Sequence, residues 1–209
     1  MALDTFADII NAACARIGEQ PVQDFDDDLG GGQSALLIYE EVVDFNLGLQ
    51  PSGFSFGREV RQLSLITGLT PLTGYTYVFD VPGPYTGMPV YLTDDPTDPR
   101  RRYTDFLLTA GRVHAQDNPL YAMVKFRPDP HRWSATFRSA TITSIAAHLA
   151  YAIASKSSDR DDLLRLAYGS AADNFRGGQM RAALFEDGFA NPPRPMAMDD
   201  NPLTNSWRS

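Results

Sequence analysis

Apolar positions repeat with a helical period near both ends of the chain and with a strand-like period in its middle. Residues 5–17 and 33–49 carry an apolar side chain every three or four positions, which predicts two amphipathic helices. Thr5 followed by Asp8 is typical of a helix start, and Gly18 is placed to end the first helix. The apolar faces are Phe6, Ile9, Ile10, Ala13 and Ile17 in the first helix and Leu36, Leu37, Tyr39, Val42 and Val43 in the second.

The middle of the chain is expected to be strands and turns. Ten of the fifteen prolines lie between Pro51 and Pro130, and proline removes a backbone donor and breaks helices. Runs rich in β-branched and aromatic residues predict strands. These runs are 60–66, 75–81, 90–92, 106–108, 112–114 and 120–126. Thr109-Ala-Gly111 predicts a hairpin turn between two of them. A sheet this small is expected to need a helical layer over one face.

Residues 131–187 contain no proline and predict two further helices. The third, at about 134–155, is apolar on nearly all sides, which is usual for the central helix of a bundle. The fourth begins at Asp159 and is interrupted by Gly177-Gly178 before residues 179–186. The predicted stripes are Ile142, Ile145, Ala146, Leu149 and Ile153 in the third helix and Leu164, Ala167, Tyr168, Ala171 and Phe175 in the fourth.

These patterns predict an α+β protein with a four-helix bundle-like lobe, a small β lobe and an extended C-terminal arm. Residues 1–56 and 129–187 form the bundle, 57–128 the β lobe, and 188–209 the arm, which has four prolines and no helical period. The expected bundle core includes Ile9, Ile17, Val42, Ile145, Leu149 and Tyr168. The arm carries apolar residues that predict an assembly contact, namely Phe189, Met196, Met198, Leu203 and Trp207.

Composition narrows the class of partner. The formal net charge of −8 is unfavourable for gripping nucleic acid, because Lys and Arg contacts to phosphate dominate that affinity. It is compatible with a wall along which DNA slides. No apolar run is long enough to cross a membrane, and the first residues lack the pattern of a signal peptide. The single cysteine, Cys14, excludes an internal disulfide and is expected to be buried and inert.

No pattern of residues indicates catalysis, a cofactor or a metal. The acidic loop Asp24, Asp26, Asp27 and Asp28 lacks the glycine and glutamate of an EF-hand, because Leu29 and Ala35 stand at those positions. His114, His131 and His148 have no metal-ligand spacing, and Gly30-Gly-Gly32 has no P-loop lysine. Arg100-Arg-Arg102 is interpreted as an exposed turn beside aspartates rather than a DNA patch. Asp129 and Trp133 are expected to cap the third helix and to staple it against the sheet.

Several local motifs, in their order, resemble the tail tubular protein A family, the head-to-tail adaptors of short-tailed phages. Residues 10–22 (INAACARIGEQPV) resemble the family's opening helix and its I-G-x-x-P-V turn. Phe54-Ser-Phe56 is similar to its W-x-F segment, with Phe54 in place of tryptophan. Residues 121–133 (YAMVKFRPDPHRW) resemble its last strand and Asp-Pro-x-x-Trp turn. Residues 137–154 resemble its Ala-rich helix, and Tyr168 lies in the helix that follows.

The resemblance implies a non-enzymatic virion protein of the phage neck, made in the host cytoplasm. It implies a homo-oligomeric, dodecameric ring that binds the portal protein, carries the tail nozzle protein and lets DNA pass through its lumen. Two alternatives stay open: another neck or head-completion protein, and a cytoplasmic domain that binds a cation through the acidic loop. The sequence of the arm differs most from the family, so its partner is open.

Overall fold

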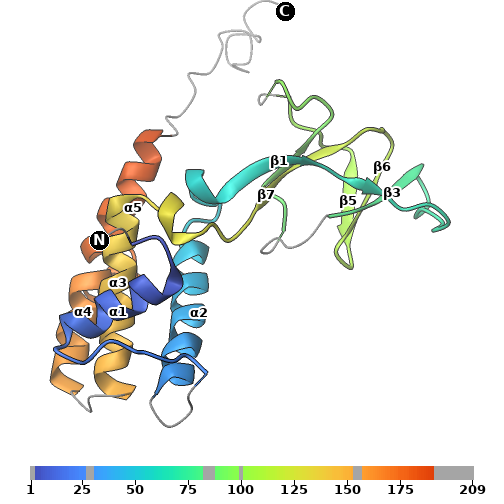
Figure 1. Cartoon of the computed structure of the whole chain (residues 1–209). Helices are drawn as coiled ribbons and strands as arrows, with labels where there is room; N and C mark the ends of the chain where they lie inside the picture. Colours follow the sequence, from blue (N-terminus) through green and yellow to red (C-terminus); the bar gives the residue numbers. More distant parts are fainter. Residues whose placement is uncertain (1–2, 27–30, 82–87, 99–100, 153–156, 191–209) are drawn as a thin grey trace, which may run out of the picture.

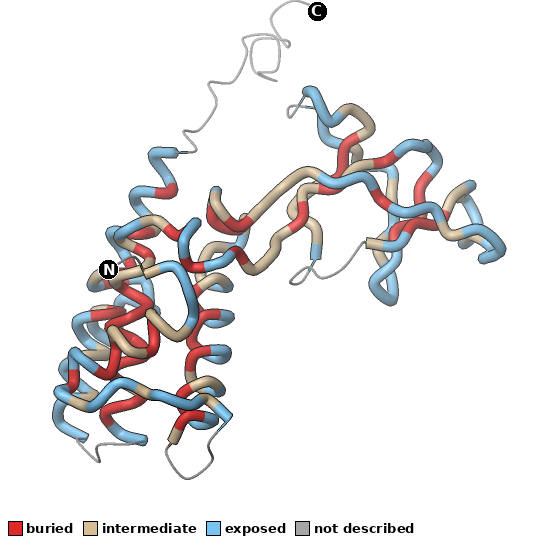
Figure 2. The backbone as a smooth tube through the Cα atoms, in the orientation of Figure 1, coloured by how far each residue is buried: buried red, intermediate tan, exposed pale blue. Residues whose placement is uncertain are grey.

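Helices from both ends of the chain lie together, and the middle of the chain forms a β unit that projects to one side of them (Figure 1). The computed structural model describes residues 3–26, 31–81, 88–98, 101–152 and 157–190. Within these ranges the chain forms five α-helices and two antiparallel sheets, which confirms the α+β class. Buried residues recur along the helices and along the strands of the β unit (Figure 2).

Helix α1 (Phe6–Arg16) begins and ends where its sequence predicts. The hydroxyl of Thr5 accepts the Asp8 backbone N–H at 3.2 Å, and the Asp8 carboxylate accepts the Thr5 N–H at 3.0 Å. This reciprocal pair satisfies donors that a helix start leaves open. Gly18 follows the helix with φ 75°, a conformation that glycine adopts without strain.

Helix α2 (Gly32–Gly48) turns a slightly different face inward than predicted. Ala35, Tyr39 and Val43 are buried as one stripe, whereas Leu37 is 67% exposed, so its assignment to the apolar side was wrong. Leu37 lies two positions before Tyr39, and two positions turn a helix by about 200°, to the opposite side. At the start of α2, a Cβ on Gly32 would lie 2.1 Å from the Asp24 carbonyl oxygen, so the preceding loop passes directly over this glycine.

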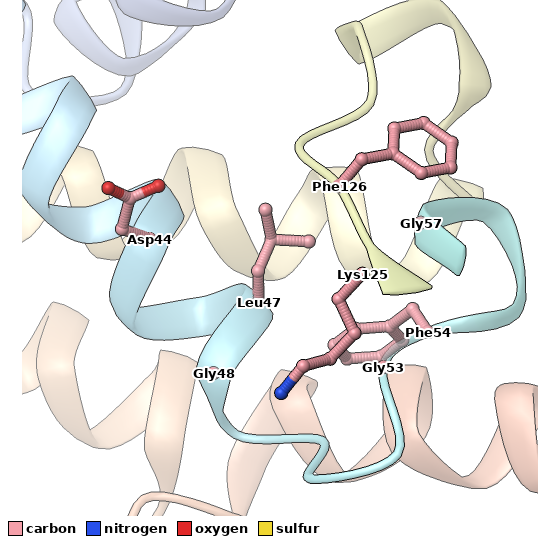
Figure 3. Close-up of a pocket in the computed structure, with 8 residues that line it drawn as sticks. All are labelled: Asp44, Leu47, Gly48, Gly53, Phe54, Gly57, Lys125 and Phe126. Atoms are coloured by element: carbon pink, nitrogen blue, oxygen red, sulfur yellow. The ribbon is translucent and has the colours of Figure 1, made fainter. Parts of the chain in front are cut away.

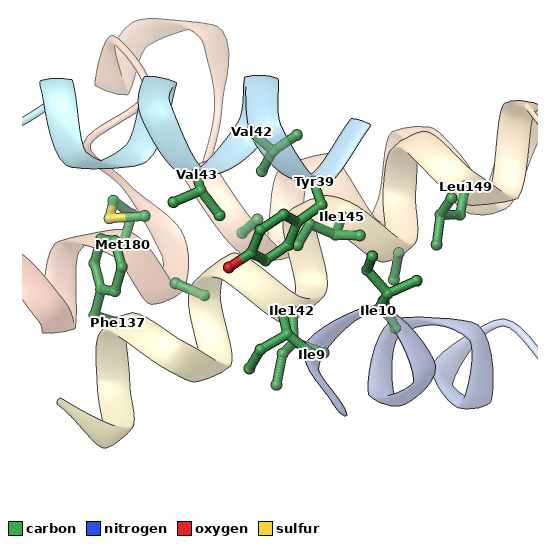
Figure 4. Close-up of a cluster of buried hydrophobic side chains, with 14 of the residues drawn as sticks. Ile9, Ile10, Tyr39, Val42, Val43, Phe137, Ile142, Ile145, Leu149 and Met180 are labelled. Carbon is green, nitrogen blue, oxygen red and sulfur yellow. The ribbon is translucent and has the colours of Figure 1, made fainter. Parts of the chain in front are cut away.

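Helix α3 (Ala135–Ala152) lies at the centre of the helical unit, as predicted. Its residues Phe137, Ile142, Ile145 and Leu149 pack with side chains of α1 and α2 in one apolar cluster (Figure 4). All six residues predicted for the bundle core belong to this cluster. They are Ile9, Ile17, Val42, Ile145, Leu149 and Tyr168.

Polar groups inside the bundle bind one another across three helices. The Tyr168 hydroxyl donates to the Asn46 side-chain oxygen at 2.6 Å, and the Asn46 amide donates to the Thr141 hydroxyl at 3.1 Å. Ser144 lies 2.5 Å from the same tyrosine oxygen. Burial raises the pKa of Tyr168, so the phenol keeps its proton at neutral pH. Because Asn46, Thr141, Ser144 and Tyr168 all find partners among themselves, this network fixes one alignment of the helices.

The predicted fourth helix is two helices. Helix α4 (Ser157–Tyr168) ends at Gly169, which has φ 81°; the 3₁₀ turn η3 (Ala171–Asp173) and helix α5 (Gly178–Ala190) follow. The predicted stripe therefore stops at Tyr168, and Ala171 and Phe175 are exposed. Gly177 approaches the end of α4 so closely that a Cβ there would lie 2.7 Å from the Tyr168 carbonyl oxygen. The left-handed Gly169 ends the helix, and the absence of a side chain at Gly177 and Gly178 lets the returning chain pass close to the end of α4.

The β unit consists of two small antiparallel sheets. One has the order β1 (Arg58–Gln62), β7 (Tyr121–Lys125), β4 (Tyr91–Thr93); the other has β2 (Ser64–Leu65), β3 (Tyr77–Asp80), β6 (Arg112–Ala115), β5 (Phe106–Thr109). The predicted β5–β6 hairpin is confirmed, and Ala110 and Gly111 in its turn both have positive φ. The run predicted as one strand at 60–66 is divided between the two sheets.

The core of the β unit lies within the unit itself, so the expectation of a helical cover was wrong. Its buried cluster contains no residue of a helix; its members are Leu63, Phe79, Leu92, Val113, Ala115, Leu120, Ala122 and Val124. Both sheets contribute to this cluster, and each therefore shields the other's apolar side chains.

Aromatic side chains anchor to the helical unit the two chain segments that lead to and from the β unit. Phe54, just before the 3₁₀ turn η1 (Ser55–Gly57), stacks on Phe56 at 5.2 Å and meets Phe137 at 4.8 Å. Trp133, just after the 3₁₀ turn η2 (Pro130–Arg132), also packs against Phe137 and donates its indole N–H to the Pro128 carbonyl at 2.9 Å. Trp133 therefore fastens α3 to the chain that follows β7, but it packs in the bundle cluster and not on the core of the sheets, where it was expected.

The predicted capping by Asp129 was wrong. Asp129 precedes η2 in extended conformation, and its side chain makes no capping hydrogen bond. Pro130 at the first position of η2 and Trp133 just after its last residue shape this turn instead. Proline is well suited to the first position of a helical turn.

Candidate assembly surfaces

The C-terminal end of the described chain is helical where an extended arm was predicted. Helix α5 continues through Gly188 and Phe189 to Ala190, so the arm does not begin at residue 188. The first proline of the C-terminal segment, Pro192, lies beyond this end, and nothing in 188–190 prevents a helix. Of the predicted arm contacts only Phe189 is described; the other four, Met196, Met198, Leu203 and Trp207, lie outside the described residues.

Helix α5 has one buried face and one exposed apolar face. Met180, Ala183 and Asp187 are buried against the rest of the helical unit. On the other side, Phe185 is 67% exposed and Phe189 71% exposed, and their rings meet edge to face at 4.7 Å. We call this side the α5 outer face; its residues are Gly178, Arg181, Ala182, Phe185 and Phe189. Sequence reasoning found Phe189 and missed Phe185, although the spacing of four residues places both on one side of a helix.

A buried carboxylate holds α5 at the end of the helical unit from which the β unit projects (Figure 1). Asp187 accepts the Ser55 backbone N–H at 2.6 Å and the Gln50 side-chain N–H at 3.2 Å. Both partners belong to the connection between α2 and the β unit. The orientation of the α5 outer face is therefore tied to the junction of the two units.

A second surface, which we call the α4 hollow, is a concavity of about 420 Å³ at the end of α4. Its lining comes from α4 and from the segment that follows it, and includes Asp161, Leu164, Arg165, Tyr168, Ala171 and Phe175. Phe175 is 57% exposed, and its ring packs edge to face on Phe45 and Tyr168. Asn174 and Phe175 have φ values of 50° and 61°, a conformation that is strained for a bulky residue.

A smaller cavity lies between the two units (Figure 3). Asp44 and Leu47 of α2 border it on one side, and Lys125 and Phe126 at the end of β7 on the other. Its volume of about 200 Å³ is below the range usual for ligand pockets, about 300–1,000 Å³. Lys125 donates to the Pro51 carbonyl at 3.4 Å across this gap. The cavity belongs to the joint between the units.

Charged groups reinforce the same joint. Arg127 forms ion pairs with Glu40 and with Asp44, the latter at 3.3 Å. Its guanidinium also lies 5.2 Å from the centre of the Tyr39 ring. These contacts attach the chain leaving β7 to the side of α2. An exposed ion pair contributes little alone, but the shared arginine holds two carboxylates and an aromatic ring together.

The residues considered for chemistry lie on separate elements. His114 on β6 is buried and its Nδ1 accepts the Leu72 N–H at 3.3 Å; His131 lies in η2 and His148 on α3. In the acidic loop, Asp24 accepts the Asp26 N–H at 2.9 Å, and Asp27 and Asp28 lie outside the described residues. In the part of the chain that the structure describes, no three His, Cys, Asp or Glu side chains come together as metal ligands.

The described arginines of the basic run and the single cysteine make contacts within the chain itself. Arg101 pairs with Asp94 at 2.7 Å, and the Arg102 guanidinium lies 5.2 Å from the Tyr91 ring centre, whereas Arg100 lies outside the described residues. Cys14 is buried in the bundle core, and burial raises the pKa of its thiol.

No described helix is both long and apolar enough to span a membrane. The chain matches no known protein-family model, and no curated protein sequence matches it.

One titratable group inside the helical unit predicts a pH dependence of stability. Burial lowers the pKa of His148 below its ordinary value of 6.5, and nearby Arg160 lowers this pKa further, although Glu41 acts in the opposite direction. Below pH 6.5 the unfolded chain therefore binds a proton that the folded chain resists, so the free energy of unfolding falls as pH decreases.

In a His148→Gln variant this decrease should be smaller. Thermal unfolding of both proteins between about pH 7.5 and pH 5 measures this pH dependence. Most carboxylates remain ionised in this range and contribute little to it. Equal pH dependence in the two proteins would contradict the prediction.

Proposed function

We propose that this protein is a structural assembly subunit that works by contacts with other protein chains. The observation that carries this proposal is the exposed aromatic face of α5, held rigidly by the buried Asp187. Two adjacent phenylalanines exposed to this extent form the kind of apolar anchor that marks protein interfaces.

More specifically, the protein is the head-to-tail adaptor of a short-tailed phage, in the manner of the tail tubular protein A family. Its subunits form a ring between the portal and the tail nozzle and extend the channel for DNA. The motifs that resemble the family support this reading, because they meet at one place. Phe54 and Phe56 from one motif and Trp133 from another all pack on Phe137, in the helix that resembles the family's Ala-rich helix.

The acidic character of the chain also supports a channel role. A net charge of −8 avoids a strong attraction for phosphate, so DNA would pass without being held. Arg101 and Arg127 form ion pairs with carboxylates of the chain itself, and Arg102 lies over the Tyr91 ring.

Electron microscopy of the purified protein mixed with the portal protein of the same virus tests the proposal. We expect rings seated on the portal that are absent when either component is left out. Sedimentation of the mixture should show the two proteins moving together. A protein that remains separate from the portal at all ratios would refute the adaptor function.

Truncation after Ala190 tests the role of the C-terminal segment, which we expect to be an assembly arm. The cut keeps all of α5, unlike a cut after Asp187, and should leave the melting temperature of the subunit nearly unchanged. Docking onto the portal should weaken, because the removed segment carries Met196, Leu203 and Trp207. Either a truncated subunit that is unfolded or one that docks with unchanged yield would overturn the arm hypothesis.

A further inference from the structure

We propose that the α5 outer face of one subunit docks into the α4 hollow of a second copy of this chain. The inference rests on the proposed function, because it names the surfaces by which ring subunits hold one another. Its occupant is a second copy since both complementary surfaces are carried by the same chain, within residues 157–190.

Each surface combines an exposed aromatic ring with a hollow, so a ring of one copy can enter the hollow of the other. On the α5 outer face, Phe185 and Phe189 are exposed beside a shallow hollow of about 370 Å³ that the small residues Gly178 and Ala182 leave open. The α4 hollow is concave, and at about 420 Å³ it has room for a phenyl ring. Its Phe175 ring is largely exposed and offers the edge-to-face contact that aromatic pairs prefer.

Charge gives the docking a direction. Arg181 lies one helical turn before Phe185 on the α5 outer face. The rim of the α4 hollow carries Asp161 and, one turn later on the same helix, Arg165. Placing Arg181 beside Asp161 pairs opposite charges, whereas the reversed placement brings two arginines together. Like charges at an interface exclude the wrong register.

A contact between two different surfaces is heterologous, so each docked copy leaves one face and one hollow open. Repetition of such a contact closes into a ring when the rotation between copies divides the circle, and otherwise gives a filament. The same pair of surfaces thus provides both the growth and the closure that the proposed function requires.

Complementation between two variants tests this pairing. Phe185→Ser with Phe189→Ser disables the outer face, and Phe175→Asn disables the hollow, since asparagine tolerates the left-handed conformation at that position. Leu37→Ser is the matched control, because Leu37 is equally exposed but belongs to neither surface. All three proteins should keep the wild-type circular dichroism spectrum and a melting temperature within a few degrees, because the changed side chains are exposed.

Each disabled variant alone should associate at least about tenfold more weakly than wild type in sedimentation velocity, with or without the portal. An equal mixture of the two should form dimers, since one intact face still meets one intact hollow. The control should assemble like wild type. Wild-type assembly in either disabled variant, or no dimers in the mixture, would overturn the inference.

A charge exchange identifies the direct partner. Arg181→Glu and Asp161→Arg should each weaken association, and the double variant should recover most of it. Failure of recovery contradicts the proposed register.

The outcomes separate this inference from the adaptor function. If every variant still forms the wild-type ring on the portal, only the pairing is refuted. Copies that associate through these surfaces without ever binding the portal refute only the adaptor. A wild-type protein that never self-associates refutes the pairing.

Discussion

Replacing Leu149 with aspartate should prevent the chain from folding. Leu149 is fully buried in the cluster that joins α1, α2 and α3. The substitution removes the buried leucine side chain, which costs about 2–5 kcal/mol, and it adds a carboxylate without a partner, which costs several more. The sum is comparable to the whole stability of a typical domain, about 5–15 kcal/mol.

Circular dichroism and thermal unfolding of Leu149→Asp measure this effect. We expect the cooperative transition to be lost and the protein to be largely insoluble. Leu37→Asp is the control on exposed α2 surface, and it should melt close to wild type. A native transition in the Leu149 variant would show that the inward face of α3 has been assigned wrongly.

Replacing Gly178 with alanine should destabilise the corner between α4 and α5 severely. Gly178 has φ 51°, and a Cβ there would lie 2.3 Å from the Leu166 carbonyl oxygen and 2.8 Å from the Gly169 nitrogen. These are backbone atoms, so no side-chain rotation relieves the clash. Left-handed backbone costs a non-glycine residue about 1–2 kcal/mol, and overpacking typically adds about 1–3 kcal/mol.

We therefore expect Gly178→Ala to lower the free energy of unfolding by about 2–5 kcal/mol, a fall in melting temperature of roughly 5–15 °C for a chain of this size. Gly188→Ala is the matched control, because Gly188 lies in the same helix and a Cβ there meets nothing within 4 Å. Alanine has a higher helix propensity than glycine. The control variant should therefore be as stable as wild type or more stable by up to about 1 kcal/mol. Equal melting temperatures for the two variants would contradict the argument.

The candidate surfaces were only partly predictable. Phe189 was recognised as an apolar anchor, but it was assigned to an extended arm, and Phe185 was assigned to the fourth helix without a role. The hollow was not predicted, because Phe175 continues the apolar period of α4 and was therefore assigned to the stripe of the fourth helix. Which apolar side chain stays exposed depends on where neighbouring elements pass, and a periodic pattern does not contain that information.

Sequence alone determined the α+β class, α1 with its cap, the central position of α3 and the β5–β6 hairpin. Each follows from residues close together in the chain, since helix caps, turn glycines and apolar periodicity act over a few positions. The tertiary structure decided what depends on distant residues. Leu63 binds the Leu120 backbone and turns into the β core, which divides one predicted strand between two sheets. Asp187 is retained in a buried position because Ser55 and Gln50, more than a hundred residues earlier, supply the hydrogen bonds that offset its loss of water.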